Sequence, residues 1–259
     1  AYTEMAISGG MTGLMGLGAA SRGGALIDQF RRPSAPPTEL PAMTPERTLE
    51  DVFNDYAARN QLAPVQPRPV SADEAKSRAA AEYYERTPSA PESPEVQNAY
   101  KALAAETEAQ YQHLVDAGYT FEPAASGVVP YTTAQDMAAD LRTNKHLLVS
   151  TDAPPEHGLL TPEQNFKFRA VHDSTHVMGG GSFGHQGEET TYALHKQLYS
   201  PEAQKALATE TRGQNATVHF GETMANPPET RYEQRADIGL KFPEQKALMW
   251  SRLLFCQNS

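Results

Sequence analysis

The chain has 259 residues, 39% of them hydrophobic, which is enough for one large domain or two small ones. Its formal net charge is -10, with 32 acidic against 22 basic residues and no basic cluster, so binding to a nucleic-acid backbone is not expected. The single cysteine, Cys256, excludes an intrachain disulfide and a thiolate metal cage.

The first part of the chain, residues 1–30, is a glycine-rich apolar segment whose stretch from Met5 to Ser21 carries no charge. A signal peptide is not expected, because Glu4 stands where a signal peptide carries positive charge. The uncharged stretch is short for a membrane-spanning helix, which needs about 20 apolar residues. We therefore expect an arm that packs against a partner, with membrane contact through residues 1–30 as the alternative.

The second part, residues 31–92, is rich in proline and predicts an extended arm with two short helices. The first helix is expected over residues 44–58, and its apolar stripe consists of Leu49, Val52, Phe53 and Tyr56. The second is expected over residues 71–85, where Ser71 and Glu74 form a capping-box pattern. Because so few apolar residues cannot form a core alone, we expect this arm to lie over other subunits.

The third part, residues 93–259, is predicted to be a compact helical domain. A helix is expected from Ser93 to about Ala117, where Gly118 ends it, and another over residues 133–142. Short strands are expected over residues 119–123 and 146–151. The predicted fold class is therefore mainly α with a few short β-strands, with a helical C-terminal domain that follows an extended proline-rich arm.

The stretch FRAVHDSTHVMGGGSFGHQGEETTYALH, residues 168–195, contains four of the eight histidines. A helix capped by Thr161 should run through it until the glycines at 179–181, which places His172 and His176 on one face. Two imidazoles at this spacing can bind one metal ion, as in the HExxH motif. The inner acid here is Asp173, whose short side chain argues against a zincin-type peptidase.

A second helix is predicted to begin near Gly187, with Glu188 and His195 on one stripe two turns apart. A short connection favours antiparallel helices, so the two stripes should face each other. The resulting set of His172, His176, Glu188 and His195 suits a divalent metal, zinc first and iron or manganese next. A hydrogen-bonded core network without metal is the alternative.

A further helix over residues 200–213 carries two charged candidates near its end. Glu210 is predicted to orient a metal-ligand imidazole by accepting a hydrogen bond from the ring nitrogen that does not bind the metal. Arg212 is expected to pair with Glu210 or to bind an anionic substrate. The catalytic candidates are thus Glu188, Asp173 and Arg212.

Four segments, FRAVHD, GEE…H, TETRGQN and EQKAL, together resemble an uncharacterised family of bacterial and bacteriophage proteins. The resemblance covers about residues 93–248, and TETRGQN, residues 209–215, is its most specific part. It implies a phage or mobile-element setting and carries no catalytic role. Members of that family have one more residue between the paired histidines than this chain, which implies an altered ligand geometry here.

Together these observations favour a structural or accessory component of a phage-like particle, located in the virion or the host cytoplasm. Its N-terminal arm would contact other protein subunits of the assembly, and its helical domain would bind a divalent metal. A metal-dependent hydrolase, with Glu188 as a fourth ligand or a base, is the alternative. A third hypothesis is a membrane-active protein that acts through residues 1–30.

Overall fold

The computed structural model describes residues 47–68, 70–152, 157–221, 245–248 and 250. The chain divides into two units, Ala1–Pro45 and Glu46–Ser259, and every described residue belongs to the second. The expectations for residues 1–30, including membrane contact, therefore lie outside the described residues. As predicted, the fold is mainly helical, and its described residues include two short strands. In the part of the chain that the structure describes, no helix combines the length and hydropathy needed to cross a membrane.

The two helices predicted within the arm are present as α1 (Leu49–Arg59) and α2 (Glu74–Arg86). The N-cap of α1 is Thr48, which forms a capping box with Asp51. The N-cap of α2 is Asp73, so the predicted cap at Ser71 was wrong. Asp73 lies one residue before Glu74, and its carboxylate reaches the backbone N–H of Lys76.

The apolar stripe of α1 lies in the same core as the later helices. The stripe consists of Leu49, Val52, Phe53 and Tyr56, and these side chains are at most 5% exposed. Through this face α1 packs against α3 (Pro94–Asp116). The compact part therefore begins earlier than the predicted boundary at residue 93. The stripe was identified correctly, but its burial partners lie far away in the sequence.

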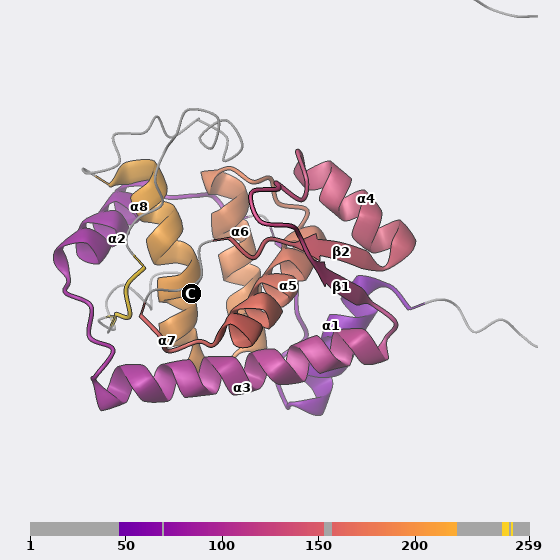
Figure 1. Cartoon of the computed structure of the whole chain (residues 1–259), viewed down its shortest axis with the longest axis horizontal. Helices are drawn as coiled ribbons and strands as arrows, with labels where there is room; N and C mark the ends of the chain where they lie inside the picture. The colour runs from indigo at the N-terminus through magenta and orange to yellow at the C-terminus, as the bar shows by residue number, and fades with distance from the viewer. Residues whose placement is uncertain (1–46, 69, 153–156, 222–244, 249, 251–259) are drawn as a thin grey trace, which may run out of the picture. The chain divides into compact units, whose positions relative to one another are not determined.

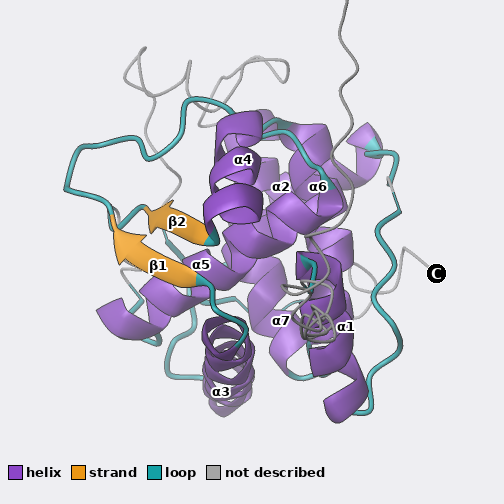
Figure 2. Cartoon of the chain, turned by 90° about the vertical axis from the view of Figure 1, so that its right-hand side faces the viewer, coloured by secondary structure: helices purple, strands orange, loops and turns teal. Residues whose placement is uncertain are grey.

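The two strands, β1 (Thr120–Pro123) and β2 (His146–Val149), form a parallel pair with Thr120 opposite His146. Helix α4 (Ala134–Asn144) joins them, because parallel strands need a crossover connection. Figure 2 shows the two strands side by side. Alternate residues of β2, Leu147 and Val149, are fully buried.

The centre of the fold is the pair α5 (Pro162–Gly179) and α6 (His185–His195). The predicted cap, Thr161, begins α5 and forms a capping box with Gln164, and Gly180 ends the helix with a φ of 64°. The loop that follows runs close to α6. A Cβ added at Gly187 would lie 1.8 Å from the backbone oxygen of Ser182, so only glycine fits there.

The predicted helix over residues 200–213 is longer than expected. It consists of α7 (Ala203–Ala208), a π-helical turn (Thr209–Gly213) and α8 (Gln214–Phe220). The predicted end at Gly213 was wrong. This glycine is helical and serves packing, because a Cβ there would lie 2.7 Å from the rings of Trp250 and Tyr84. Figure 1 shows α8 beside α2 and α7 beside α3.

Candidate functional site

The four residues predicted as metal ligands lie together between α5 and α6. The Glu188 carboxylate lies between two imidazoles, with 3.3 Å from its Oε1 to His176 Nε2 and 3.6 Å from its Oε2 to His172 Nε2. The other ring nitrogen of His172, Nδ1, lies 3.4 Å from Nδ1 of His195. The structure thus orders the four as a row: His176, Glu188, His172, His195.

Helix geometry explains this row. His172 and His176 are one turn apart on α5, so one carboxylate on the facing helix reaches both rings. Glu188 and His195 share a face of α6 but lie two turns apart, which is about 10 Å along the axis. The expectation that all four groups meet at one point was therefore wrong for His195. It contacts the side of the His172 ring that faces away from Glu188.

The row is not a ready-made metal cage. Among the residues that the structure describes, no three His, Cys, Asp or Glu side chains are grouped so as to hold an ion. The rings of His172 and His176 are nearly perpendicular with centroids 6.0 Å apart, and each faces a different oxygen of Glu188. The contacts are those of a chain of ion pairs and hydrogen bonds.

The surroundings of the row raise the pKa of His176 and lower the pKa values of Glu188 and His195. Burial alone would raise the pKa of Glu188, but the charges and hydrogen bonds of His176 and His172 outweigh it and lower that pKa. Burial alone would lower the pKa of His176, but Glu188 and Asp173 raise it above its ordinary value. Burial holds the pKa of His195 well below its ordinary value, and the charge of His172 lowers it further. Similar groups with opposite shifts are typical of sites that move protons.

Burial within the row is uneven. The His195 side chain is fully buried against the rings of Tyr199 and Phe168, at centroid distances of 5.0 and 6.0 Å. Its Nε2 has no hydrogen-bond partner within the described part of the chain. By contrast, the side chains of His172 and Glu188 are 17% and 24% exposed. Solvent therefore reaches the row at its centre.

The predicted catalytic Asp173 lies near this row. Burial raises the pKa of its carboxyl, while the charges of His172 and His176 act to lower it. Asp173 is therefore an acid that gives up its proton less readily than an exposed aspartate. No described hydrogen bond joins it to the ring nitrogens of the two histidines.

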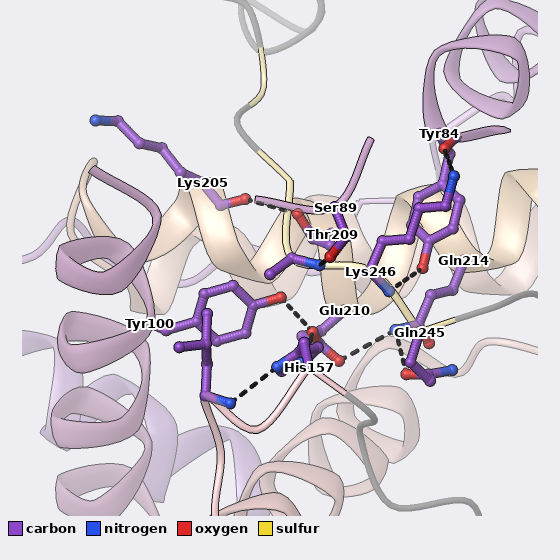
Figure 3. Close-up of polar contacts among 12 residues, drawn as sticks. Tyr84, Ser89, Tyr100, His157, Lys205, Thr209, Glu210, Gln214, Gln245 and Lys246 are labelled. Atoms are coloured by element: carbon purple, nitrogen blue, oxygen red, sulfur yellow. Dashed lines mark hydrogen bonds and ion pairs between the residues drawn. The ribbon is translucent and has the colours of Figure 1, made fainter. Parts of the chain in front are cut away.

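Glu210 does not support the row. It accepts hydrogen bonds from the Tyr100 hydroxyl, from His157 Nε2 at 3.0 Å and from Gln214 at 3.1 Å (Figure 3). The prediction that it orients a metal-ligand imidazole was wrong in its partner, because the imidazole it contacts is His157. That histidine stands alone in a loop, so no spacing in the sequence could have indicated it.

Arg212 also lies away from the row and pairs with a different carboxylate than predicted. Its Nε donates to Glu189 Oε1 at 3.2 Å, and its guanidinium lies over the Tyr192 ring, 5.6 Å from the centroid. Glu189 follows Glu188 directly and therefore lies on a different face of α6. The sequence did not indicate the partner of Glu189, which is Arg212, 23 residues further along the chain.

His185, the fourth histidine of the stretch, also lies outside the row. Its Nε2 is 2.9 Å from the Ser77 hydroxyl of α2. That hydroxyl donates to the Asp73 carbonyl, so it accepts from the imidazole and is not activated as a nucleophile.

Comparisons place no further constraint on the site. No family model, no curated protein and no solved structure matches the chain. The resemblance to the bacterial and bacteriophage family stays a prediction.

Proposed function

We propose that the chain binds one divalent metal ion of the zinc class through His172, His176 and Glu188. The observation that carries this proposal is the spacing of two imidazole nitrogens from the two oxygens of one carboxylate, 3.3 and 3.6 Å. Ligand atoms bonded to zinc at about 2.0–2.2 Å in a tetrahedron lie about 3.3–3.6 Å from one another. Each Glu188 oxygen has this spacing to one imidazole nitrogen, so the three side chains would have to draw closer together to hold one ion among the described residues. Two imidazoles and one carboxylate form a ligand set that zinc accepts, and iron and manganese accept it too.

The charge states of the row act on metal binding in both directions. A metal needs an ionised carboxylate, and the lowered pKa of Glu188 keeps its carboxylate ionised at neutral pH. It also needs neutral imidazoles, and because the pKa of His176 is raised, the ion must displace a proton from that ring. The lowered pKa of His195 keeps that ring neutral, so its Nδ1 can accept a hydrogen bond from His172 Nδ1 and orient the His172 ring. His195 is then a positioning residue rather than a ligand.

Calorimetric titration of the metal-free full chain with Zn²⁺ tests this proposal. Wild type should bind about one ion per chain, since the row offers one set of three ligands. His176→Ala and Glu188→Gln should each weaken binding by at least about 10–100-fold, a loss that even outer partners of metal ligands cause. The matched control is His146→Ala, because His146 also pairs with a carboxylate, that of Asp140, but outside the row. Equal binding by wild type and Glu188→Gln would reject the proposal.

Hydrolysis at this ion is the second candidate function. The observation that favours it is the combination of three ligand groups with partial exposure of His172 and Glu188. Catalytic zinc sites have three protein ligands and an open position, where the ion activates a water molecule. The zinc-loaded chain should then cleave labelled casein or nitrophenyl esters, and Glu188→Gln should not. If zinc binds but neither substrate is cleaved, metal binding stands and hydrolysis of these substrates is rejected.

The assembly role stays a prediction. It depends on residues 1–30, which lie outside the described residues, and on the arm, of which the structure describes residues 47–68 and 70–92. Location in the virion or the host cytoplasm is a prediction of the same kind.

A further inference from the structure

A second polar site includes Glu189, which lies on a different face of α6 from Glu188 of the histidine row. It is a pocket of about 320 Å³ lined by five polar residues, Ser71, Asp73, Lys76, Glu189 and Arg212. They come from the start of α2, from α6 and from the π-helical turn, three segments far apart in the sequence. Its volume is near the lower end of the range for ligand sites, about 300–1,000 Å³.

One wall of the pocket is a buried ion pair. The side chains of Arg212 and Glu189 are 9% and 4% exposed, with 3.2 Å between Nε and Oε1. The Tyr192 ring beneath the guanidinium adds a cation–π contact at 5.6 Å. Taking two charges out of water costs free energy that their attraction does not reliably recover. Such a pair is therefore weak evidence for stability, and it holds both charged groups in a fixed position at the pocket wall.

The part of the lining that comes from the start of α2 repeats the same combination of charges. Asp73 accepts a hydrogen bond from the backbone N–H of Lys76 at 3.2 Å, and the Lys76 ammonium lies 3.6 Å from its second oxygen. Each part of the lining thus presents one carboxylate and one cation, and Ser71 adds a hydroxyl. The described residues that line the pocket are all polar or charged, which favours a polar ligand.

Two neighbouring features are typical of a functional site. Arg212 lies in a π-helical turn, an arrangement that occurs frequently at functional sites. His185 is within electrostatic range of both Glu189 and Arg212.

We propose that this pocket binds a small zwitterion of the α-amino-acid class, with its carboxylate toward Arg212 and Lys76 and its ammonium toward Glu189 and Asp73. A simple anion would be repelled by the two carboxylates, and a simple cation would be repelled by the two basic groups. Only a ligand that carries both charges pairs with both kinds of group. The site does not require a metal in the histidine row.

A binding assay on the metal-free full chain tests this inference. The probes are the free α-amino acids one by one, with acetate, methylamine and inorganic phosphate as ligands that lack one of the two charges. At least one amino acid should raise the thermal midpoint in a saturable way, by the mass-action stabilisation of the folded state. Acetate, methylamine and phosphate should produce no such shift.

The variants separate ligand binding from folding. Asp73→Asn keeps a good N-cap for α2 but removes the charge, and Lys76→Gln changes a side chain that is 35% exposed. Each should weaken amino-acid binding about tenfold, which corresponds to about 1.4 kcal/mol. Glu74→Gln is the control, because this exposed carboxylate is on α2 outside the pocket lining. No binding by any amino acid, equal binding of phosphate or acetate, or unchanged affinity in both variants would overturn the inference.

Discussion

At the scale of single residues, His195 and His176 show how position along one row changes an imidazole. His176 faces a carboxylate and gains proton affinity, whereas His195 is buried among rings and loses it. Their effects on stability therefore have opposite signs. Stability from His176 is present below pH 6.5 and is lost as the pH rises through its raised pKa.

His195 gives the first prediction. Below pH 6.5 His195 binds a proton in the unfolded chain but stays neutral in the folded chain. Falling pH therefore favours the unfolded chain, and the stability that the neutral His195 ring contributes is lost. In the metal-free His195→Gln variant, this loss should shrink by up to about 1.4 kcal/mol per pH unit below pH 6.5. Urea unfolding of both proteins at pH 6.5 and pH 5 measures it. Identical pH dependences would contradict the assignment of a buried neutral ring.

Gly213 gives the second prediction. An added methyl group would lie 2.7 Å from the rings of Trp250 and Tyr84, so Gly213→Ala should destabilise the fold by about 1–3 kcal/mol. Gly184→Ala is the control, because the nearest atom there is a Ser182 hydroxyl at 3.8 Å. Urea midpoints compare the two variants. A harmless Gly213→Ala would mean that the rings do not pack as described.

At the scale of elements, Glu210 joins segments that are distant in the sequence. Tyr100 belongs to α3, His157 to the loop before α5, and Gln214 to the start of α8. Gln214 also donates to Gln245 at 2.9 Å and so extends the network toward the C-terminal segment (Figure 3). One carboxylate thereby accepts donors from three segments, as buried acids generally do.

The third prediction follows from this network. Glu210→Gln replaces one acceptor oxygen with an NH₂ group, which faces donors and leaves buried groups unpaired. We expect a loss of about 1–3 kcal/mol in the free energy of unfolding, measured in urea. Glu202→Gln, at a partly exposed ion pair with Lys205, should change stability by less than about 0.5 kcal/mol. Equal stabilities of the two variants would remove Glu210 from its structural role.

Local chemistry made several elements predictable. Thr161, Pro162 and Gln164 combine a cap, a fixed φ and a capping box, and α5 begins where they indicate. The four-residue spacing of His172 and His176 likewise predicted that they share a face. The same reasoning failed at Gly213, because its glycine serves close packing with Trp250 rather than a helix end. It failed for His195 because helical spacing shows that Glu188 and His195 share a face of α6, but that face extends over two turns, and His195 lies too far along the helix axis to meet Glu188.

At the scale of the whole described unit, residues 245–248 pack back onto the region predicted as an arm. The Ala247 carbonyl accepts from the backbone N–H of Ala90 at 2.8 Å. The Lys246 ammonium donates to three carbonyl oxygens at the end of α2, those of Tyr84, Glu85 and Thr87. These contacts link residues about 160 positions apart, which no local pattern reveals. The sequence therefore predicted the helices of this unit but not its extent.

The fourth prediction concerns Trp250, the single tryptophan of the chain, which is 6% exposed. Its Nε1 donates to the Thr209 hydroxyl at 2.7 Å. Trp250→Ala should cost about 3–5 kcal/mol in the free energy of unfolding, followed by far-ultraviolet circular dichroism. Trp250→Phe keeps a ring and loses the hydrogen bond, so it should cost less. A loss below about 1 kcal/mol in Trp250→Ala would show that the segment is not docked.

The central claim, that the row between α5 and α6 binds a divalent ion, is tested most directly by elemental analysis. The full chain is equilibrated with zinc, passed through a desalting column and analysed beside Glu188→Gln and His146→Ala. Wild type and His146→Ala should retain about one zinc per chain, and Glu188→Gln should retain much less. Wild type without retained zinc, or Glu188→Gln with as much as wild type, would contradict the account.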